Sequence, residues 1–120
     1  MYILSADHGR VLCDVNGYIN EVVCHSDRKL PRVKRTEKCT VWSSDYAYLW
    51  QNSRGNWESQ QGMCAGDPLQ AMTDDPPELP VGTTVTAGDV AVMATDDGVL
   101  VWSGVAGHGF QFSGRTVRTW

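Results

Sequence analysis

The sequence predicts an all-β domain of short antiparallel strands and hairpins, arranged as a small sandwich or a partly open barrel. Its 120 residues include 12 glycines and five tryptophans. Glycine suits turns, while Trp, Val, Thr and Tyr suit pleated surfaces. Turn signals recur about every 8 to 12 residues, without a heptad or a sequence repeat. The length indicates a single domain that spans residues 1–120.

The first hairpin is predicted around Asn16-Gly17, because both residues of a type I′ turn need positive φ. It would join strands at residues 10–13 and 18–24. A two-residue loop places Val11 beside Val22, whereas a four-residue loop places Leu12 beside Ile19. The apolar pattern does not choose between these two registers.

The middle of the chain is predicted to be a basic connection followed by an aromatic hairpin. Residues 25–38 contain six of the ten Lys and Arg residues, and Pro31 argues against a regular element there. Strands are expected at residues 39–43 and 47–51. A return strand follows from Asn56 after the turn at residues 52–55, so that Trp50 and Trp57 meet across the hairpin.

Residues 62–80 are rich in glycine and proline and are expected to form a loose connection. One short helix is predicted near residues 68–72. Asp67 would cap this helix and Pro68 would take its first position, while Pro76-Pro77 would end it.

The last 40 residues give the clearest β pattern. Strands are expected at residues 83–86, 90–95 and 99–103, followed by a final hairpin of residues 110–112 and 115–120. A three-residue loop at 96–98 would create one apolar face, the predicted core sheet, from Val90, Val92, Ala94, Leu100 and Trp102.

Residues 81–90 read Val-Gly-Thr-Thr-Val-Thr-Ala-Gly-Asp-Val. This segment resembles the turn pattern of barrel-sandwich hybrid domains, the family that includes lipoyl and biotinyl carriers. The resemblance implies a strand, a tight turn at Gly88-Asp89 and a second strand. A carrier also displays a lysine at a hairpin tip, whereas the tip here is Asp96-Asp97-Gly98. Only the turn geometry is therefore expected to carry over.

Charge is divided unevenly along the chain. No Lys or Arg lies between Arg54 and Arg115, and that gap holds eight of the 14 carboxylates. The formal net charge of −4 thus combines a half at +4 with a half at −8. Charge asymmetry concerns partners rather than fold. It predicts an acidic face that engages a protein with a basic surface, or a second copy of the chain in a homodimer.

The four cysteines show no closely spaced pair, which argues against a zinc knuckle and a thioredoxin-like motif. They are expected to be thiols in a reducing compartment. A structural zinc ion held by all four is a less favoured alternative, and an oxidising compartment would allow two disulfides in any of three pairings. These cysteines are Cys13, Cys24, Cys39 and Cys64.

Composition also limits the location and the partners. The sequence shows no basic and apolar leader and no apolar stretch long enough to span a membrane, so a cytoplasmic location without a membrane partner is predicted. A pI near 5.2 makes nucleic acid an unlikely partner.

Aromatic residues are the predicted binding residues. Tyr46, Tyr48 and Trp50 stand two residues apart and share one face of a strand, while Ala47 and Leu49 face the other way. Exposed Tyr and Trp often supply the energy of interfaces. Together with the acidic pairs, the predicted binding set is Tyr46, Tyr48, Trp50, Trp57, Asp74, Asp75, Asp96 and Asp97.

These features favour a small non-enzymatic binding protein. Size and charge suggest an analogy with phage-encoded inhibitors of host machinery, which act in the host cytoplasm. One alternative is a carbohydrate-binding module that stacks Tyr46, Tyr48, Trp50 and Trp57 on sugar. Another is a metal-dependent hydrolase that uses His25 or His108. No catalytic residue is assigned, because Cys24 and His25 point to opposite faces of a strand and no catalytic motif is present.

Overall fold

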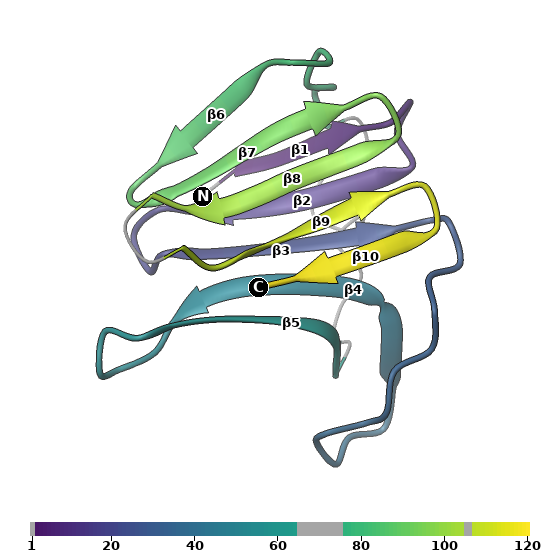
Figure 1. Cartoon of the computed structure of the whole chain (residues 1–120), viewed down its shortest axis with the longest axis vertical. Helices are drawn as coiled ribbons and strands as arrows, with labels where there is room; N and C mark the ends of the chain where they lie inside the picture. Colours follow the sequence, from purple (N-terminus) through teal and green to yellow (C-terminus); the bar gives the residue numbers. More distant parts are fainter. Residues whose placement is uncertain (1, 65–75, 105–106) are drawn as a thin grey trace.

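Ten strands form two five-stranded antiparallel sheets that pack face to face as a sandwich (Figure 1). The computed structural model describes residues 2–64, 76–104 and 107–120, and no helix is found among them. The predicted all-β sandwich is therefore confirmed. The helix predicted near residues 68–72, with its cap Asp67, lies outside the described residues.

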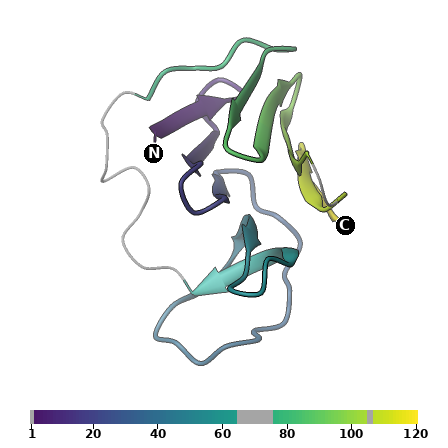
Figure 2. The same ribbon diagram turned by 90° about the vertical axis from the view of Figure 1, so that its left-hand side faces the viewer.

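Both sheets are simple meanders, in which each strand pairs with its neighbours in sequence. Sheet A, ordered β1-β2-β3-β4-β5, contains β1 (Tyr2–Ala6), β2 (Val11–Asn16), β3 (Glu21–Ser26), β4 (Trp42–Gln51) and β5 (Trp57–Cys64). Sheet B, ordered β10-β9-β8-β7-β6, contains β6 (Thr84–Ala87), β7 (Val90–Thr95), β8 (Gly98–Ser103), β9 (Gly109–Ser113) and β10 (Thr116–Thr119). Figure 2 shows the two sheets facing each other across the core.

The core fills the space between the inward faces of the two sheets. Its largest fully buried side chains are Phe110 and Phe112 from β9 and Leu49 from β4. Burial of such a side chain contributes about 1.5 to 3 kcal/mol. Valines of β2, β3, β7 and β8 complete the core, with Val11, Val15, Val22, Val90, Val92, Val99 and Val101 all fully buried.

Contacts at both sides of the sandwich help to close it. On one side, the edge of β1 pairs with an extended segment, because Leu79 donates its backbone N–H to the carbonyl of Ser5 (2.8 Å) and Ser5 donates to the carbonyl of Pro77 (2.9 Å). On the other side, the hydroxyl of Ser59 in β5 donates to the carbonyl of Trp120, just after β10 (2.8 Å). The segment before β6 thus covers the edge of β1, and β5 of sheet A is linked to the end of β10 in sheet B.

The first hairpin adopts neither predicted register. Asn16 pairs with Glu21, so the turn comprises the four residues 17–20, and the second strand begins three residues later than predicted. Asn20 explains the difference, because it adopts a positive φ of 51° and ends the turn. This register places Cys13 opposite Cys24.

The hairpin of β7 and β8 differs from prediction by one residue. Its turn is Asp96-Asp97 alone, since Thr95 pairs with Gly98. Gly98 pairs with Ser113 within β8, and only glycine fits there because a Cβ atom would collide with the carbonyl of Phe112. A one-residue shift reverses the faces of a strand, so the core receives Val99 and Val101, whereas Leu100 and Trp102 lie on the outer face.

Strands β6 to β9 of sheet B lie in the sequence between Arg54 and Arg115, which contains no Lys or Arg. The outward positions of β6 to β9 carry only uncharged side chains, and Asp89, Asp96 and Asp97 lie in the turns between strands. From β6 to β9, sheet B is therefore uncharged on its outward face and acidic in its turns, whereas Glu58 of the same half lies on β5. The outward residues of β6 to β9 include Thr84, Thr86, Ala91, Met93, Thr95, Leu100, Trp102 and Gln111.

Candidate binding surface

The outer face of β4 presents an aromatic stack. Ala47 and Leu49 are buried in the core, so Tyr46, Tyr48 and Trp50 lie on the opposite face of the strand, and their predicted common face is confirmed. The rings of Tyr48 and Trp50 stack, with centroids 4.2 Å apart and planes inclined by 24°. Both side chains are half-buried, so each retains surface available for contact.

Carboxylates flank this stack on neighbouring strands. Trp50 lies opposite Glu21 of β3 on one side and Glu58 of β5 on the other, and directly opposed side chains on one face are close neighbours. Asp14 of β2 lies on the same outer face, two strands away from Tyr48. We call these five residues (Asp14, Glu21, Tyr48, Trp50 and Glu58) the aromatic–acid surface.

Burial disfavours the charged forms of two carboxylates of the aromatic–acid surface, Asp14 and Glu21. Burial raises the pKa of Asp14. Burial also raises the pKa of Glu21, and the nearby carboxylate of Asp14 raises it further. The Oδ1 atom of Asp14 is buried and accepts no hydrogen bond from the described residues. The charged forms of these acids are therefore disfavoured and would gain from a bound cation.

The pKa of Tyr48 is also affected by burial and by nearby carboxylates. Burial raises the pKa of its hydroxyl, and the carboxylates of Glu37, Glu21 and Glu58 raise it further. Negative potential therefore converges on the aromatic stack from residues of several elements.

The tip of the first hairpin lies beside this surface. Tyr18 is 94% exposed and Ile19 is 56% exposed. The sequence predicts both in a strand, but they precede β3 in the structure. Asn20 fixes the tip, because its side-chain amide donates to Oε1 of Gln51 (2.9 Å) and its Oδ1 accepts from the backbone N–H of Asp89 (3.1 Å). Asn20 is the sequence signal that could have revealed a longer turn.

Two of the predicted aromatic contact residues, Tyr46 and Trp57, are buried. Tyr46 is 8% exposed and packs beside His25, with ring centroids 4.7 Å apart. Trp57 is 6% exposed and belongs to the core. Trp57 pairs with Gln51, so it does not meet Trp50 across the hairpin as predicted.

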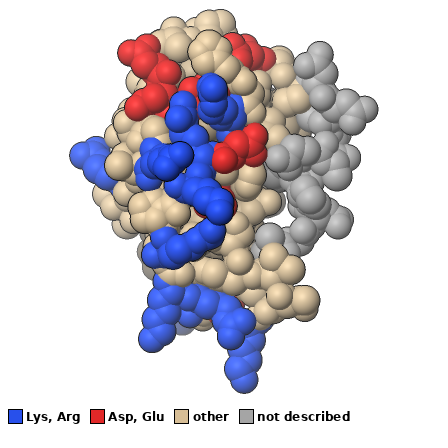
Figure 3. Space-filling view, turned by 90° about the vertical axis from the view of Figure 1, so that its right-hand side faces the viewer, with Lys and Arg blue, Asp and Glu red and all other residues tan. Residues whose placement is uncertain are grey.

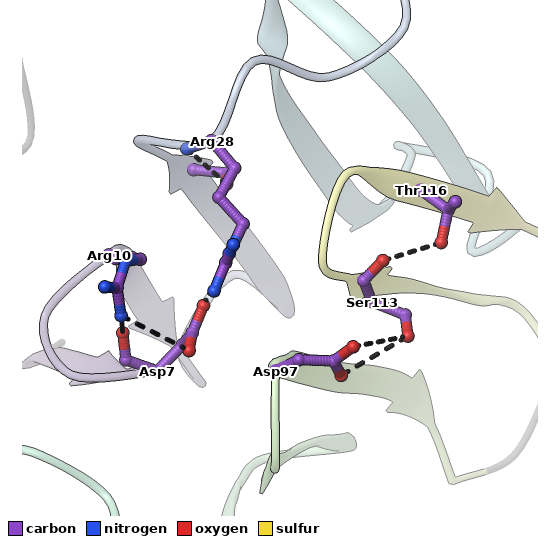
Figure 4. A network of polar contacts seen from close by, with 7 residues as sticks. Asp7, Arg10, Arg28, Asp97, Ser113 and Thr116 are labelled. Carbon is purple, nitrogen blue, oxygen red and sulfur yellow. Dashed lines mark hydrogen bonds and ion pairs between the residues drawn. The ribbon is translucent and has the colours of Figure 1, made fainter.

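The predicted acidic pairs do not join the aromatic stack among the described residues. Asp96 and Asp97 form the turn between β7 and β8, at the end of the sandwich away from Trp50 (Figure 1). Asp97 accepts a hydrogen bond from the hydroxyl of Ser113 (3.1 Å), as Figure 4 shows. Asp74 and Asp75 lie outside the described residues.

All four cysteines form disulfides, in contrast to the expected thiols. Cys13 and Cys24 are directly opposed on β2 and β3, with Cα atoms 4.1 Å apart, and both are fully buried. Cys39 and Cys64 have Cα atoms 5.8 Å apart and connect the segment before β4 to the end of β5. These pairings use the four thiols that the zinc alternative would require.

The two histidines of the hydrolase alternative lie on different elements. His25 is on the outer face of β3, whereas Cys24 faces the core. His108 lies near the carboxyl end of the chain, with Nδ1 3.1 Å from the carbonyl oxygen of Trp120. The described residues contain no group of three or more His, Cys, Asp or Glu side chains arranged to hold a metal ion. Nor do they contain a helix long and apolar enough to cross a membrane.

Comparisons with protein-family models, with curated proteins and with solved structures find no match for this chain. The function proposed next therefore rests on the chemistry of the aromatic–acid surface.

Proposed function

We propose that this protein is a non-enzymatic binding module whose aromatic–acid surface captures a lysine or arginine side chain of a protein partner. The observation that carries the proposal is the position of Trp50 between Glu21 and Glu58, with Tyr48 stacked against it. The face of an aromatic ring attracts a cation. Carboxylates on both sides add charge-assisted hydrogen bonds.

The state of the carboxylates supports a cationic ligand. Asp14 and Glu21 have raised pKa values because burial penalises their charged forms. A cation that approaches them would stabilise the ionised forms and lower both pKa values. Binding is therefore expected to strengthen as the pH rises through the interval in which these groups lose their protons.

The exposed hairpin tip supports a macromolecular partner. Tyr18 and Ile19 offer apolar contact area next to Glu21, beyond what a single cationic side chain needs. Because Asn20 already fixes the tip, little conformational entropy would be lost on binding. An aromatic anchor surrounded by less important contacts is the usual form of a protein-binding hot spot.

Two disulfides favour an oxidising compartment over the cytoplasm that the sequence suggested. The analogy with inhibitors that act in a host cytoplasm gains no support from them. We therefore assign the proposed function to a binding protein of an oxidising environment.

Calorimetry with short peptides tests the proposal, using peptides in which one lysine or arginine is flanked by apolar residues. Trp50→Ala should weaken binding at least about tenfold, and Glu21→Gln with Glu58→Gln should do the same. The matched control is Asp89→Asn with Asp96→Asn, which changes the net charge equally but lies in turns of sheet B. It should change affinity by less than about twofold.

Salt dependence distinguishes the alternatives. Peptide binding should weaken as ionic strength rises, because screening reduces attraction between charges. Binding that Trp50→Ala leaves unchanged would refute the proposed surface. Tight, salt-independent binding of neutral oligosaccharides that Trp50→Ala abolishes would identify a carbohydrate-binding module instead.

A further inference from the structure

A second charged surface lies in the connection between β3 and β4. Residues 28–38, here called the basic connection, contain six Lys and Arg residues and one Glu. Figure 3 shows Lys and Arg as a stripe down one side of the molecule. The six cations are Arg28, Lys29, Arg32, Lys34, Arg35 and Lys38.

Hydrogen bonds hold the backbone of the basic connection in place. The N–H of Leu30, whose side chain is 3% exposed, donates to Oδ1 of Asp45 (3.1 Å). The N–H of Val33 donates to Oγ of Ser44 (3.0 Å), and its carbonyl accepts from Nε1 of Trp42 (3.2 Å). An irregular segment is thus attached to β4 at two points.

Strand β5 provides further anchors. The side-chain amide of Gln61 donates to the carbonyl of Pro31 (2.7 Å). The Cys39–Cys64 disulfide ties the far end of the connection to the end of β5. The cationic side chains therefore extend from a fixed backbone, which reduces the entropy lost when they bind a ligand.

Most of these cations are unpaired. Arg28 alone has a strong partner, because its Nε lies 2.9 Å from Oδ2 of Asp7, a carboxylate shared with Arg10 (Figure 4). The carboxylate of Asp97 accepts a hydrogen bond from the hydroxyl of Ser113, and no ion pair joins it to these cations among the described residues. Within the part of the chain that the structure describes, no ion pair is formed by the remaining five, Lys29, Arg32, Lys34, Arg35 and Lys38.

We propose that the basic connection binds a linear acidic polysaccharide that carries repeated sulfate or carboxylate groups. A series of unpaired cations on an anchored backbone matches repeated anions and is attracted to them by their combined field. Residues 28–38 contain no aromatic side chain on which a nucleobase could stack. Of their two aliphatic residues, Leu30 is buried and Val33 is half-buried against β4, so neither offers a fully exposed side chain to a bilayer.

The test uses heparin, a sulfated polysaccharide, as the probe and compares two double variants. Lys34→Gln with Arg35→Gln removes two exposed cations of the basic connection. Arg54→Gln with Arg118→Gln removes the same charge from a turn after β4 and from β10. The first variant should bind heparin about tenfold more weakly, with a salt slope lowered by about one for each cation removed. The second should bind within about twofold of the unchanged protein.

Three outcomes would overturn the proposal. One is a failure of the unchanged protein to bind heparin at low salt. Another is equal weakening by both variants, which would show an effect of net charge alone. The third is tighter binding, at matched salt, to single-stranded DNA or to phosphatidylglycerol vesicles than to heparin, which would assign the surface to a different class of ligand. The variants that test this proposal change no residue of the aromatic–acid surface, so either proposal can fail alone.

Discussion

The backbone of Gly17 lies directly against the backbone of Gly88. A Cβ atom added to Gly88 would lie 2.5 Å from the carbonyl oxygen of Gly17, and Gly88 has a positive φ of 57°. The contact joins the turn between β2 and β3 to the turn between β6 and β7. The two sheets therefore meet there through backbone atoms, with no room for a side chain.

Gly88→Ala is expected to destabilise the protein by about 2 to 4 kcal/mol. A left-handed conformation costs an L-residue about 1 to 2 kcal/mol, and overpacking adds a similar penalty. Urea denaturation measures the effect. Gly104→Ala is the matched control, because its added Cβ would meet nothing closer than 3.8 Å. Equal losses in both variants would contradict the importance of the Gly17–Gly88 contact.

The two disulfides should differ in their reaction with a mild reductant. Cys13 and Cys24 are fully buried between the sheets, whereas Cys39 and Cys64 are partly exposed. Thiol–disulfide exchange requires access to sulfur. Alkylation after brief reduction, read by mass spectrometry, should therefore label Cys39 and Cys64 first. Labelling of all four at the same rate would show that reduction requires global unfolding.

The contribution of Asp14 and Glu21 to stability should increase as the pH falls from neutral. The folded protein holds the protons of Asp14 and Glu21 more strongly than the unfolded chain, since their pKa values are raised above the ordinary 3.8 and 4.5. Their contribution to the free energy of unfolding is then fully present below those ordinary values and is lost as the pH rises through the interval above them. Asp14→Asn and Glu21→Gln should remove part of this dependence.

Thermal denaturation at a series of pH values tests this expectation. Both variants should melt at higher temperature than the unchanged protein at pH 7 and show a flatter pH profile. Asp89→Asn, in the exposed turn between β6 and β7, serves as the control for net charge. A profile that Asp14→Asn and Glu21→Gln leave unchanged would show that other groups control the acid response.

Two tryptophans seven residues apart should respond differently to truncation. Trp57→Ala removes a core side chain that is 6% exposed and should cost about 3 to 5 kcal/mol. Trp50→Ala removes a half-buried side chain from the outer face and should cost about 1 kcal/mol. Denaturant unfolding of both variants measures the difference. A large loss for Trp50→Ala would give that residue a structural role and weaken the proposed binding surface.

Much of the fold could be predicted because strand patterns and turn residues are local. The Gly88-Asp89 turn and the final hairpin follow from such signals, as does the outward face of Tyr46, Tyr48 and Trp50. Strand β1 was not predicted, although it pairs with β2 in the observed fold. The register of the strands could not be predicted from the sequence, because runs such as Val99 to Trp102 are apolar at every position and fit either face of a strand.

The candidate surface was harder to predict than the fold. Glu21 and Glu58 are far apart in sequence, and only the pairing of three strands brings them to either side of Trp50. The part of the sequence without Lys and Arg predicts binding roles for Asp96 and Asp97, which form a turn in the structure. The exposure of Tyr18 depended on a turn length that a single sequence does not determine.

The meander order of both sheets has a consequence for how the molecule could be assembled. All pairing between strands of sheet A occurs within residues 2–64, and all such pairing in sheet B occurs within residues 84–119. Both disulfides also lie within the first range. If the chain were cut between Cys64 and Pro76, the first piece would keep sheet A and both disulfides, and the second piece would keep sheet B. We expect the two pieces to reconstitute the domain by fragment complementation, because each presents an apolar face that only the other covers.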